Sequence, residues 1–314
     1  MWLLASIFGV MAMGAALVSV SDTTDDDNDP IDDDTEDGGA GSGGTTGGSS
    51  IIPGDDGDNT LSGSDGEDQI NGYAGNDNIS GQAGDDWLLG DEGSDSLVGG
   101  AGSDTLDGGR DDDVLAGNTG NDQLNGANGD DSLSGGDGED SLNGGLGDDI
   151  LHGDLGDDWL AGRHGDDTLV GGIGSDTLSG FEGNDLLVGT ALDDNDRDQD
   201  GLDFLNGGSG NDVIIAGAGD VLNGGEGVDT GVFGLWNTDA DPSVWQDFDP
   251  AEDQIVVILP EGVESVVSIL TDPNDPTIGY LQVDGETLAT LEGGGDVEAE
   301  AVTVLRSEPG EIEN

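Results

Sequence analysis

Cysteine and lysine are absent from this 314-residue chain, and histidine and aromatic residues are scarce. Without cysteine there are no disulfides, zinc–thiolate sites or thiol nucleophiles. Only four arginines face 72 acidic residues, which leaves a formal net charge of −68 at pH 7. Such a charge excludes nucleic acid as a partner and disfavours anionic membrane surfaces. Catalysis is not expected either, because no H-E-x-x-H, G-x-S-x-G or P-loop pattern occurs.

The remaining composition is dominated by 62 glycines and by aspartate. High charge with few large apolar residues indicates disorder, and we expect disorder whenever counter-ions are missing. Hard divalent cations are the partners that this charge favours. A regular repeat in the sequence predicts a folded state once such cations are present.

A nine-residue unit repeats fifteen times without a slip from Gly54 to Val188. Its order is Gly-x-x-Gly-x-Asp-x-apolar-x. Position one is always glycine. Position four is glycine except in one unit, where Asp111 takes its place, and position six is aspartate except in one unit, where Asn59 takes its place. Position eight is always leucine or isoleucine. A fixed short period of this kind dictates the architecture of the chain.

This repeat resembles the calcium-binding RTX nonapeptide family, whose pattern is G-G-x-G-x-D followed by an apolar position. The units Gly135–Asn143 and Gly171–Ser179 match it in full. The resemblance implies an all-β fold, a right-handed parallel β-roll of about ten coil turns with two units per turn. It also implies several Ca2+ ions between the turns of successive coils, and type I secretion followed by folding outside the cell.

The residues themselves support this interpretation. Glycines at positions one and four permit a six-residue tight turn, and positions seven to nine form a three-residue strand whose middle side chain points inward. Leu61 should therefore stack on Ile79. One such apolar side chain per unit is too little to fold the array. Asp68 should face Asp86 in the next coil, and these carboxylates repel unless a cation that accepts 6–8 oxygens lies between them.

We therefore predict that the residues at position six are the calcium ligands. They are Asn59, Asp68, Asp77, Asp86, Asp95, Asp104, Asp113, Asp122, Asp131, Asp140, Asp149, Asp158, Asp167, Asp176, Asp185, Asp203 and Asp212. Acidic residues at position five, such as Asp85 and Asp130, either add ligands or face solvent. Magnesium should substitute poorly because it prefers a smaller, rigid octahedron. Metal binding and folding should be one process.

Two segments precede the repeats. Residues 1–20 include 19 uncharged apolar or small residues at 2–20, which as a helix could insert into and span a membrane. A membrane anchor, an atypical cleaved signal and a buried start remain alternatives for it. Residues 21–53 form a linker that is first acidic and then rich in glycine, serine and threonine.

The calcium-binding roll extends over residues 54–232, with two irregularities. Gly189–Arg197 loses the pattern, which predicts a bulge or loop excursion, and Ala216–Asn223 is one residue short. Residues 233–314 form a β-rich C-terminal cap in which Asp284-Gly285 predicts a hairpin turn. Trp236, Trp245 and Phe248 should help to close the end of the roll. The strands predicted for the cap are Gln254–Leu259, Val263–Leu270, Thr277–Val283, Glu286–Leu291 and Val297–Leu305.

The function that the sequence favours is calcium binding by a non-enzymatic, secreted or cell-surface protein whose roll folds on binding calcium. One alternative is a surface adhesion protein, with the roll as a stalk and the cap as the module that binds a protein or glycan. Another is a secreted hydrolase whose enzyme domain is not in these residues. Trp87 and Trp159 should lie on one face, four coil turns apart, as a ligand-contacting pair or as incidental surface aromatics.

Overall fold

The structure is a computed structural model that describes residues 48–192, 200–235, 242–260, 262, 264–294, 297 and 302–307. The helix predicted within residues 1–20, the linker up to residue 47 and Trp236 lie outside these ranges. The elements of the described part are β-strands. No helix in it has the length and apolar character needed to cross a membrane.

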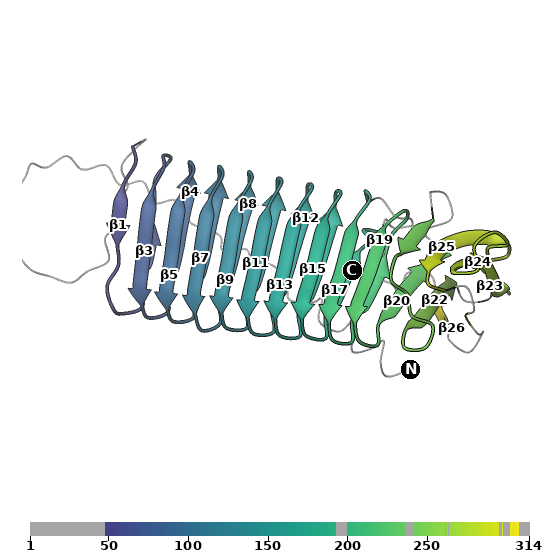
Figure 1. Cartoon of the computed structure of the whole chain (residues 1–314). Coiled ribbons are helices and arrows are strands. Elements are labelled where there is room, and N and C mark those ends of the chain that lie inside the picture. Colours follow the sequence, from purple (N-terminus) through teal and green to yellow (C-terminus); the bar gives the residue numbers. More distant parts are fainter. Residues whose placement is uncertain are drawn as a thin grey trace, which may run out of the picture.

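Two sheets, each parallel throughout the roll, are wound alternately from one chain (Figure 1). The first holds β1 (Ile51–Pro53), β3 (Gln69–Ala74), β5 (Trp87–Glu92), β7 (Thr105–Arg110), β9 (Gln123–Asn128), β11 (Ser141–Leu146), β13 (Trp159–His164), β15 (Thr177–Glu182), β17 (Phe204–Ser209), β19 (Val221–Glu226), β21 (Ser243–Trp245), β25 (Glu286–Glu292), β24 (Ile278–Val283) and β23 (Val267–Thr271).

The second sheet faces the first across the core. It holds β2 (Thr60–Ser62), β4 (Asn78–Ala83), β6 (Ser96–Ala101), β8 (Val114–Thr119), β10 (Ser132–Asp137), β12 (Ile150–Leu155), β14 (Thr168–Ile173), β16 (Leu186–Gly189), β18 (Val213–Ala216), β20 (Thr230–Gly234), β22 (Gln254–Pro260) and β26 (Val302–Ser307). Each strand pairs with the strand two units further along, so two units make one coil. The parallel β-roll predicted from the repeat is confirmed.

The strands are longer than predicted. In the regular coils each has six residues, from position seven of one unit to position three of the next, as in β4 and β6. The second half of each strand also pairs with the neighbouring coil, for example Gln82 with Gly100 and Ala83 with Ala101. The predicted division into a three-residue strand and a six-residue turn was therefore wrong, because the ladder continues through the glycine at position one.

Glycine serves two different needs in these turns. Position four adopts a left-handed backbone, as at Gly75 with φ 109°, and position one permits close approach, since a Cβ on Gly144 would lie 2.2 Å from the Oδ2 of Asp149. Position two is left-handed as well, even where it is not glycine, as at Tyr73 (φ 76°) and Gln82 (φ 83°). The left-handed position two was not predicted.

The core is a double column of leucine and isoleucine side chains from position eight. Leu61 stacks on Ile79 and Ile70 on Leu88, as predicted. These side chains are at most 5 % exposed. The column continues into the cap, where Trp245 meets Phe248 edge-on at a centroid distance of 4.9 Å. Both rings are buried, which confirms that they close the end of the roll.

Both irregularities of the repeat are visible in the pairing. Regular strands pair at an offset of 18 residues, whereas Thr177 pairs with Phe204 and Leu186 with Val213, an offset of 27. One whole unit therefore leaves the coil between β16 and β17, and the predicted excursion is confirmed. Val213 pairs with Thr230 at an offset of 17, because the next unit is one residue short.

The cap extends both sheets of the roll. β22 and β26 continue the second sheet in parallel, and β21 and β25 continue the first. The β24–β25 hairpin turns at Asp284 and Gly285, both left-handed, as predicted. β23 begins at Val267 rather than at Val263, because the N–H and C=O of Val266 bond to Asp284 in the hairpin turn.

Candidate metal centre

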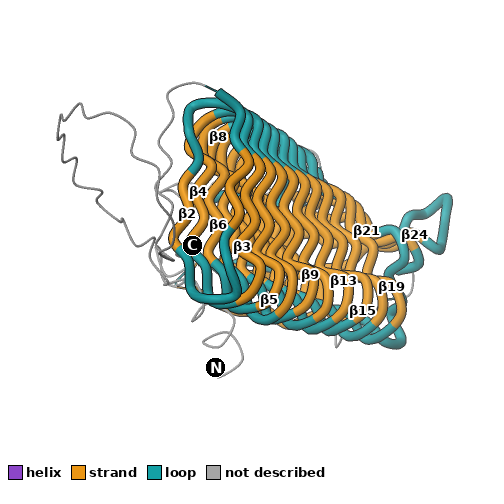
Figure 2. Tube along the Cα trace, turned by 90° about the vertical axis from the view of Figure 1, so that its left-hand side faces the viewer, coloured by secondary structure: helices purple, strands orange, loops and turns teal. Residues whose placement is uncertain are grey.

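The position-six side chains form two ladders, one along each edge of the roll, where the turns lie in Figure 2. In each ladder the Oδ1 atom accepts the backbone N–H of the position-six residue one coil earlier, as from Asp68 to Asp86 at 2.7 Å. The first ladder is Asp68, Asp86, Asp104, Asp122, Asp140, Asp158, Asp176, Asp203 and Asp220. The second is Asn59, Asp77, Asp95, Asp113, Asp131, Asp149, Asp167, Asp185, Asp212, Asp229 and Asp253.

Every residue predicted at position six lies in one of these ladders, and the structure adds three more. Asp220 follows the one-residue deletion, Asp229 occupies position six of the last unit, and Asp253 lies in the cap. Each stands two residues before an inward-pointing position, as Asp253 does before Ile255. For Asp220 and Asp253 the available signal was the Asp-x-apolar spacing, and for Asp229 it was the G-G-x-G-x-D pattern that begins at Gly224; the prediction used neither beyond Asp212.

The second carboxylate oxygen of these residues is the unusual feature. Within the described residues, fifteen ladder aspartates have a buried Oδ2 atom without a hydrogen-bond donor. They are Asp77, Asp86, Asp95, Asp104, Asp113, Asp122, Asp131, Asp140, Asp149, Asp158, Asp167, Asp176, Asp185, Asp203 and Asp212. A buried polar atom left unsatisfied costs about 1–3 kcal/mol, and more when charged. A repeated cost of this kind indicates a cation, and carboxylate oxygens fit Ca2+.

The first coil differs from this pattern. Asn59 bonds within its own turn, since its Oδ1 accepts the N–H of Asp55 and its Nδ2 donates to the carbonyl of Gly57 at 2.6 Å. The Oδ2 of Asp68 accepts the N–H and hydroxyl of Ser64. Protein donors therefore satisfy these two predicted ligands, which have the least need of a cation.

Position-five side chains form an outer ladder. Its carboxylates accept N–H groups from the next coil, whereas those of the inner ladders accept N–H groups from the previous coil. Asp85 accepts the N–H of Ser103 at 2.9 Å, and Asp130 accepts that of Asp148, one coil later in each case. These side chains are exposed. They tie successive turns together from outside, a role that the sequence did not reveal.

Burial and crowding both raise the pKa values of the inner ladders. Desolvation is the largest cause, a backbone N–H bond partly offsets it, and neighbouring carboxylates add repulsion. The pKa is raised to about 8 for Asp113 and Asp167, to about 7 for Asp149 and to about 6 for Asp122. Without metal, Asp113 and Asp167 favour the protonated form near neutral pH, whereas Asp122 is mostly ionised there.

Metal-free roll should therefore lose stability as pH rises from about 4 to about 8. The folded pKa values lie above the ordinary 3.8, so in this window the folded state binds more protons, and deprotonation lowers the free energy of unfolding. The β-sheet circular dichroism in chelator at pH 5 and pH 8 measures this, and a stronger β signal at pH 8 would contradict it. In calcium the trend should reverse, because protons compete with the metal.

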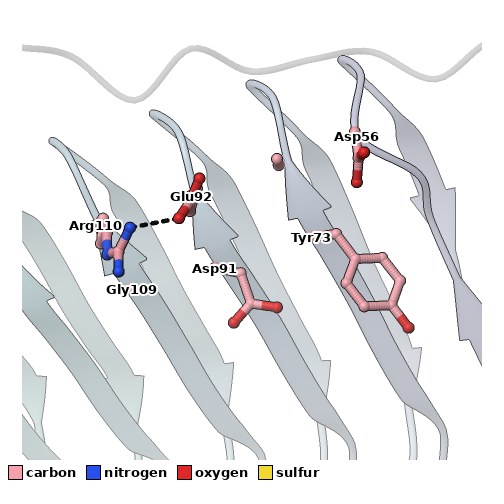
Figure 3. Close-up of a pocket in the computed structure, with 7 residues that line it drawn as sticks. Asp56, Tyr73, Asp91, Glu92, Gly109 and Arg110 are labelled. Carbon is pink, nitrogen blue, oxygen red and sulfur yellow. Dashed lines mark hydrogen bonds and ion pairs between the residues drawn. The ribbon is translucent and has the colours of Figure 1, made fainter.

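A shallow hollow of about 440 Å³ lies on the outer face of the first sheet (Figure 3). Asp56, Asp91 and Glu92 give it an acidic lining, and Arg110 forms an ion pair with Glu92. Tyr73 is also part of the lining. The lining residues hold no pairing of a nucleophile with a base, and the hollow is separate from both aspartate ladders.

Trp87 and Trp159 lie on this same sheet, on β5 and β13, four strands apart as predicted. Their exposed fractions are 51 % and 37 %. Trp159 has a cationic neighbour, since the guanidinium of Arg163 lies 5.7 Å from its ring centroid and 4.6 Å from that of Phe181. Contact of the tryptophan pair with a ligand stays a prediction.

Fold and ladders together define a parallel β-solenoid with buried acidic turns. The sequence pattern of the RTX calcium-binding nonapeptide repeat matches residues 53–88, 89–124, 125–160, 161–195 and 199–231. These matches cover more than half of the chain, which therefore belongs to this family. RTX repeats bind Ca2+, so the cofactor of this chain is Ca2+, in several copies.

The solved structures to which the chain is similar include the following two. One is the solution structure of the AlgE6R3 subunit from the Azotobacter vinelandii mannuronan C5-epimerase, 28 % identical, with 51 % of this chain and 88 % of that chain covered and a TM-score of 0.27. The other is the extracellular lipase LipA from Serratia marcescens, 19 % identical, with 84 % of this chain and 40 % of the lipase covered and a TM-score of 0.17. No curated protein sequence matches the chain.

Proposed function

We propose that this chain is a non-enzymatic calcium-binding module of the cell exterior or cell surface, whose roll folds when Ca2+ occupies the two ladders. The buried, unpartnered Oδ2 atoms of the inner aspartates carry this proposal. Each such atom belongs to a carboxylate that backbone hydrogen bonding already holds in place through Oδ1. The remaining oxygen is then directed to a ligand that carries positive charge.

The ligands in this proposal are the position-six residues predicted from the sequence. Successive ladder members are neighbours along the coil, so one ion contacts carboxylates of two coils and each carboxylate serves adjacent ions. Binding at one site then orders the turn that the next site needs. We therefore expect cooperative binding.

Calcium suits these sites better than magnesium. The donors are carboxylate and carbonyl oxygens on a backbone whose turn has only three residues, and calcium accepts 6–8 such oxygens at 2.3–2.6 Å with flexible geometry. Magnesium demands an octahedron at about 2.0–2.1 Å and retains its water. A site formed by stacking two turns cannot easily contract to that geometry.

Calcium binding by the full chain tests this proposal, with isothermal titration calorimetry as the measurement. Asp131→Asn removes a carboxylate from the inner ladder, while Asp130→Asn makes the same change on the neighbouring exposed side chain. We expect several Ca2+ ions per chain, weak magnesium binding, at least tenfold weaker calcium affinity at the sites that contain Asp131, and near-normal binding with Asp130→Asn. Equal calcium and magnesium affinity, or equal effects of the two substitutions, would contradict it.

The adhesion hypothesis, in which the roll is a stalk and the cap binds a protein or glycan, stays a prediction. Its relevant surface is an apolar groove of about 190 Å³ at the end of the roll, lined by residues of β23 and β26 with Val297. Leu270 and Val304 nearby are 51 % and 40 % exposed. This apolar end favours a role for the cap in contacts outside the chain.

A further inference from the structure

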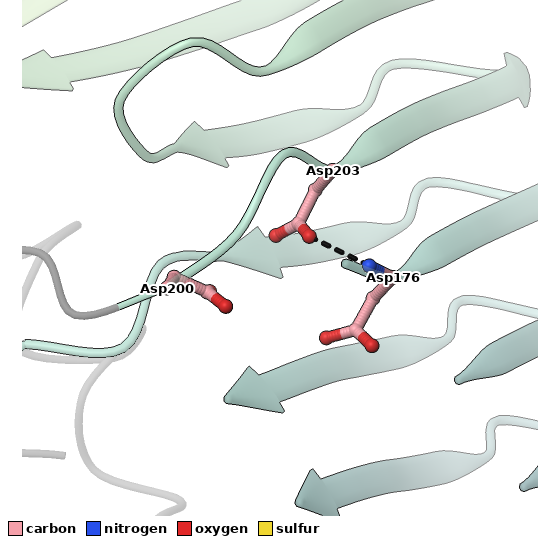
Figure 4. Close-up of side chains that lie close together, drawn as sticks. All are labelled: Asp176, Asp200 and Asp203. Carbon is pink, nitrogen blue, oxygen red and sulfur yellow. Dashed lines mark hydrogen bonds between the residues drawn. The ribbon is translucent and has the colours of Figure 1, made fainter. Parts of the chain in front are cut away.

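One aspartate outside the position-six pattern turns into the coil. Asp200 stands at position three of its unit, a position whose side chain elsewhere points outward, as Asp137 does on β10. The chain reaches Asp200 directly from the nine-residue excursion between β16 and β17. There it is half-buried and lies beside the first ladder (Figure 4).

The hydrogen bonds of Asp200 explain this orientation. In regular coils the N–H of the position-four glycine donates to a backbone carbonyl at position three of the next coil, as from Gly156 to Ile173 at 2.8 Å. At the excursion the N–H of Gly174 donates instead to the Oδ1 of Asp200, at 2.9 Å. The N–H of Gly201 donates to the same oxygen at 2.8 Å. The side chain thus takes the place of the missing backbone bond.

Because the Asp200 side chain replaces a backbone acceptor, a third carboxylate lies close to two successive aspartates of the first ladder. Ligand oxygens of Asp176, Asp200 and Asp203 all lie within 4.8 Å of one another. Asp176 and Asp203 are fully buried, and the Oδ2 atom of each has no hydrogen-bond donor. Elsewhere among the described residues, no third acidic side chain comes equally close to two successive aspartates of the first ladder.

We propose that Asp176, Asp200 and Asp203 form a three-carboxylate Ca2+ site that binds calcium more tightly than the two-carboxylate sites of the regular coils. The inference rests on the proposed function, since it concerns a special member of the same ladder. Affinity in oxygen-ligand calcium sites rises with the number of charged ligands. Three carboxylates within this distance also repel one another strongly when no cation is present.

The position of this site in the roll should affect how the roll folds. It joins the coil of β15 to that of β17, across the one place where 27 residues instead of 18 separate paired strands. The longer loop raises the entropic cost of closing the coil there. Filling this site first holds the two coils in register, so that folding proceeds from the excursion in both directions.

Calorimetric titration of the full chain with calcium, in competition with a chelator of known affinity, tests the proposal. Asp200→Asn keeps an oxygen that can accept the N–H bonds of Gly174 and Gly201 but removes the charge. Asp137→Asn makes the same change at the same repeat position on an outward side chain. We expect Asp200→Asn to weaken the tightest calcium class at least tenfold, while Asp137→Asn leaves it unchanged.

A second measurement uses the unaltered chain. With one equivalent of calcium, hydrogen exchange should slow first at the amides of Gly174 and Asp176, before those of central turns such as Gly138. Exchange that slows uniformly, or first elsewhere, would overturn the proposal, as would an unchanged tight class in Asp200→Asn. Absence of calcium binding in the unaltered chain would instead overturn the proposed function, so the two failures are distinguishable.

Discussion

Chelation of calcium at pH 8 should abolish most of the β-sheet circular dichroism of this chain. The core has one apolar side chain per nine residues, and both edges of the roll carry stacked buried carboxylates. Each Ca2+ site that is saturated at a hundredfold excess over its dissociation constant contributes about 2.7 kcal/mol. With many sites in series, calcium supplies more stability than a domain of ordinary size possesses.

A titration that returns calcium to the chelated chain measures this effect by far-UV circular dichroism. The β signal should rise steeply and cooperatively, and magnesium at the same concentration should restore little of it. Sodium chloride at matched ionic strength is the control for screening, because salt weakens repulsion between exposed charges without filling a buried site. A full β signal in chelator at pH 8 would show that the roll folds without metal.

Alanine in place of Gly156 should cause a large loss of stability. Gly156 stands at position four with φ 130°, where an added Cβ would lie 1.6 Å from the carbonyl oxygen of Gly138 in the preceding coil. Backbone strain at such an angle costs about 1–3 kcal/mol. Overpacking against a fixed backbone adds about 1–3 kcal/mol. The expected decrease in the free energy of unfolding is about 3 kcal/mol or more.

Position two supplies the matched control for Gly156→Ala. Gly145 also has a left-handed backbone, and an added Cβ would lie 2.2 Å from the carbonyl oxygen of Ala127, but Asn118 and Ala127 occupy the same repeat position with φ of 76° and 78°, so the backbone there can turn to accept a side chain. Gly145→Asn should therefore cost less than about 1 kcal/mol, because asparagine tolerates this region. Denaturant unfolding in saturating calcium compares the two variants. Equal losses would contradict a special cost of the contact between position four and the preceding coil.

The sequence was sufficient to predict the stacking and the inner ladders, because both follow from the period. Two units per coil place residues 18 apart side by side, which is how Leu61 meets Ile79 and Asp68 meets Asp86. The same reasoning located the excursion at Gly189–Arg197, where the pattern of apolar and acidic positions fails. These features depend on spacing alone, and spacing is explicit in the sequence.

Other features depend on which backbone groups remain unpaired, and spacing does not show this. The length of the strands, the outer ladder of Asp85 and Asp130, and the inward turn of Asp200 all arise because an N–H or C=O lacks its regular partner. Position two is left-handed for the same kind of reason, since the strand must bend there into the turn. Only the folded coil reveals these unmet hydrogen bonds.

Because short strands alternate between two sheets, the folded roll also has a fixed length between its first coil and the cap. Ten strands of the first sheet, from β1 to β19, stack at about 4.8 Å each and fix a separation of about 45 Å. An unfolded segment of the same number of residues has ends on the order of 100 Å apart and fluctuating widely. Under the proposed function, calcium therefore sets the distance between the start of the roll and the cap, because it converts an extended, fluctuating segment into a spacer of fixed length.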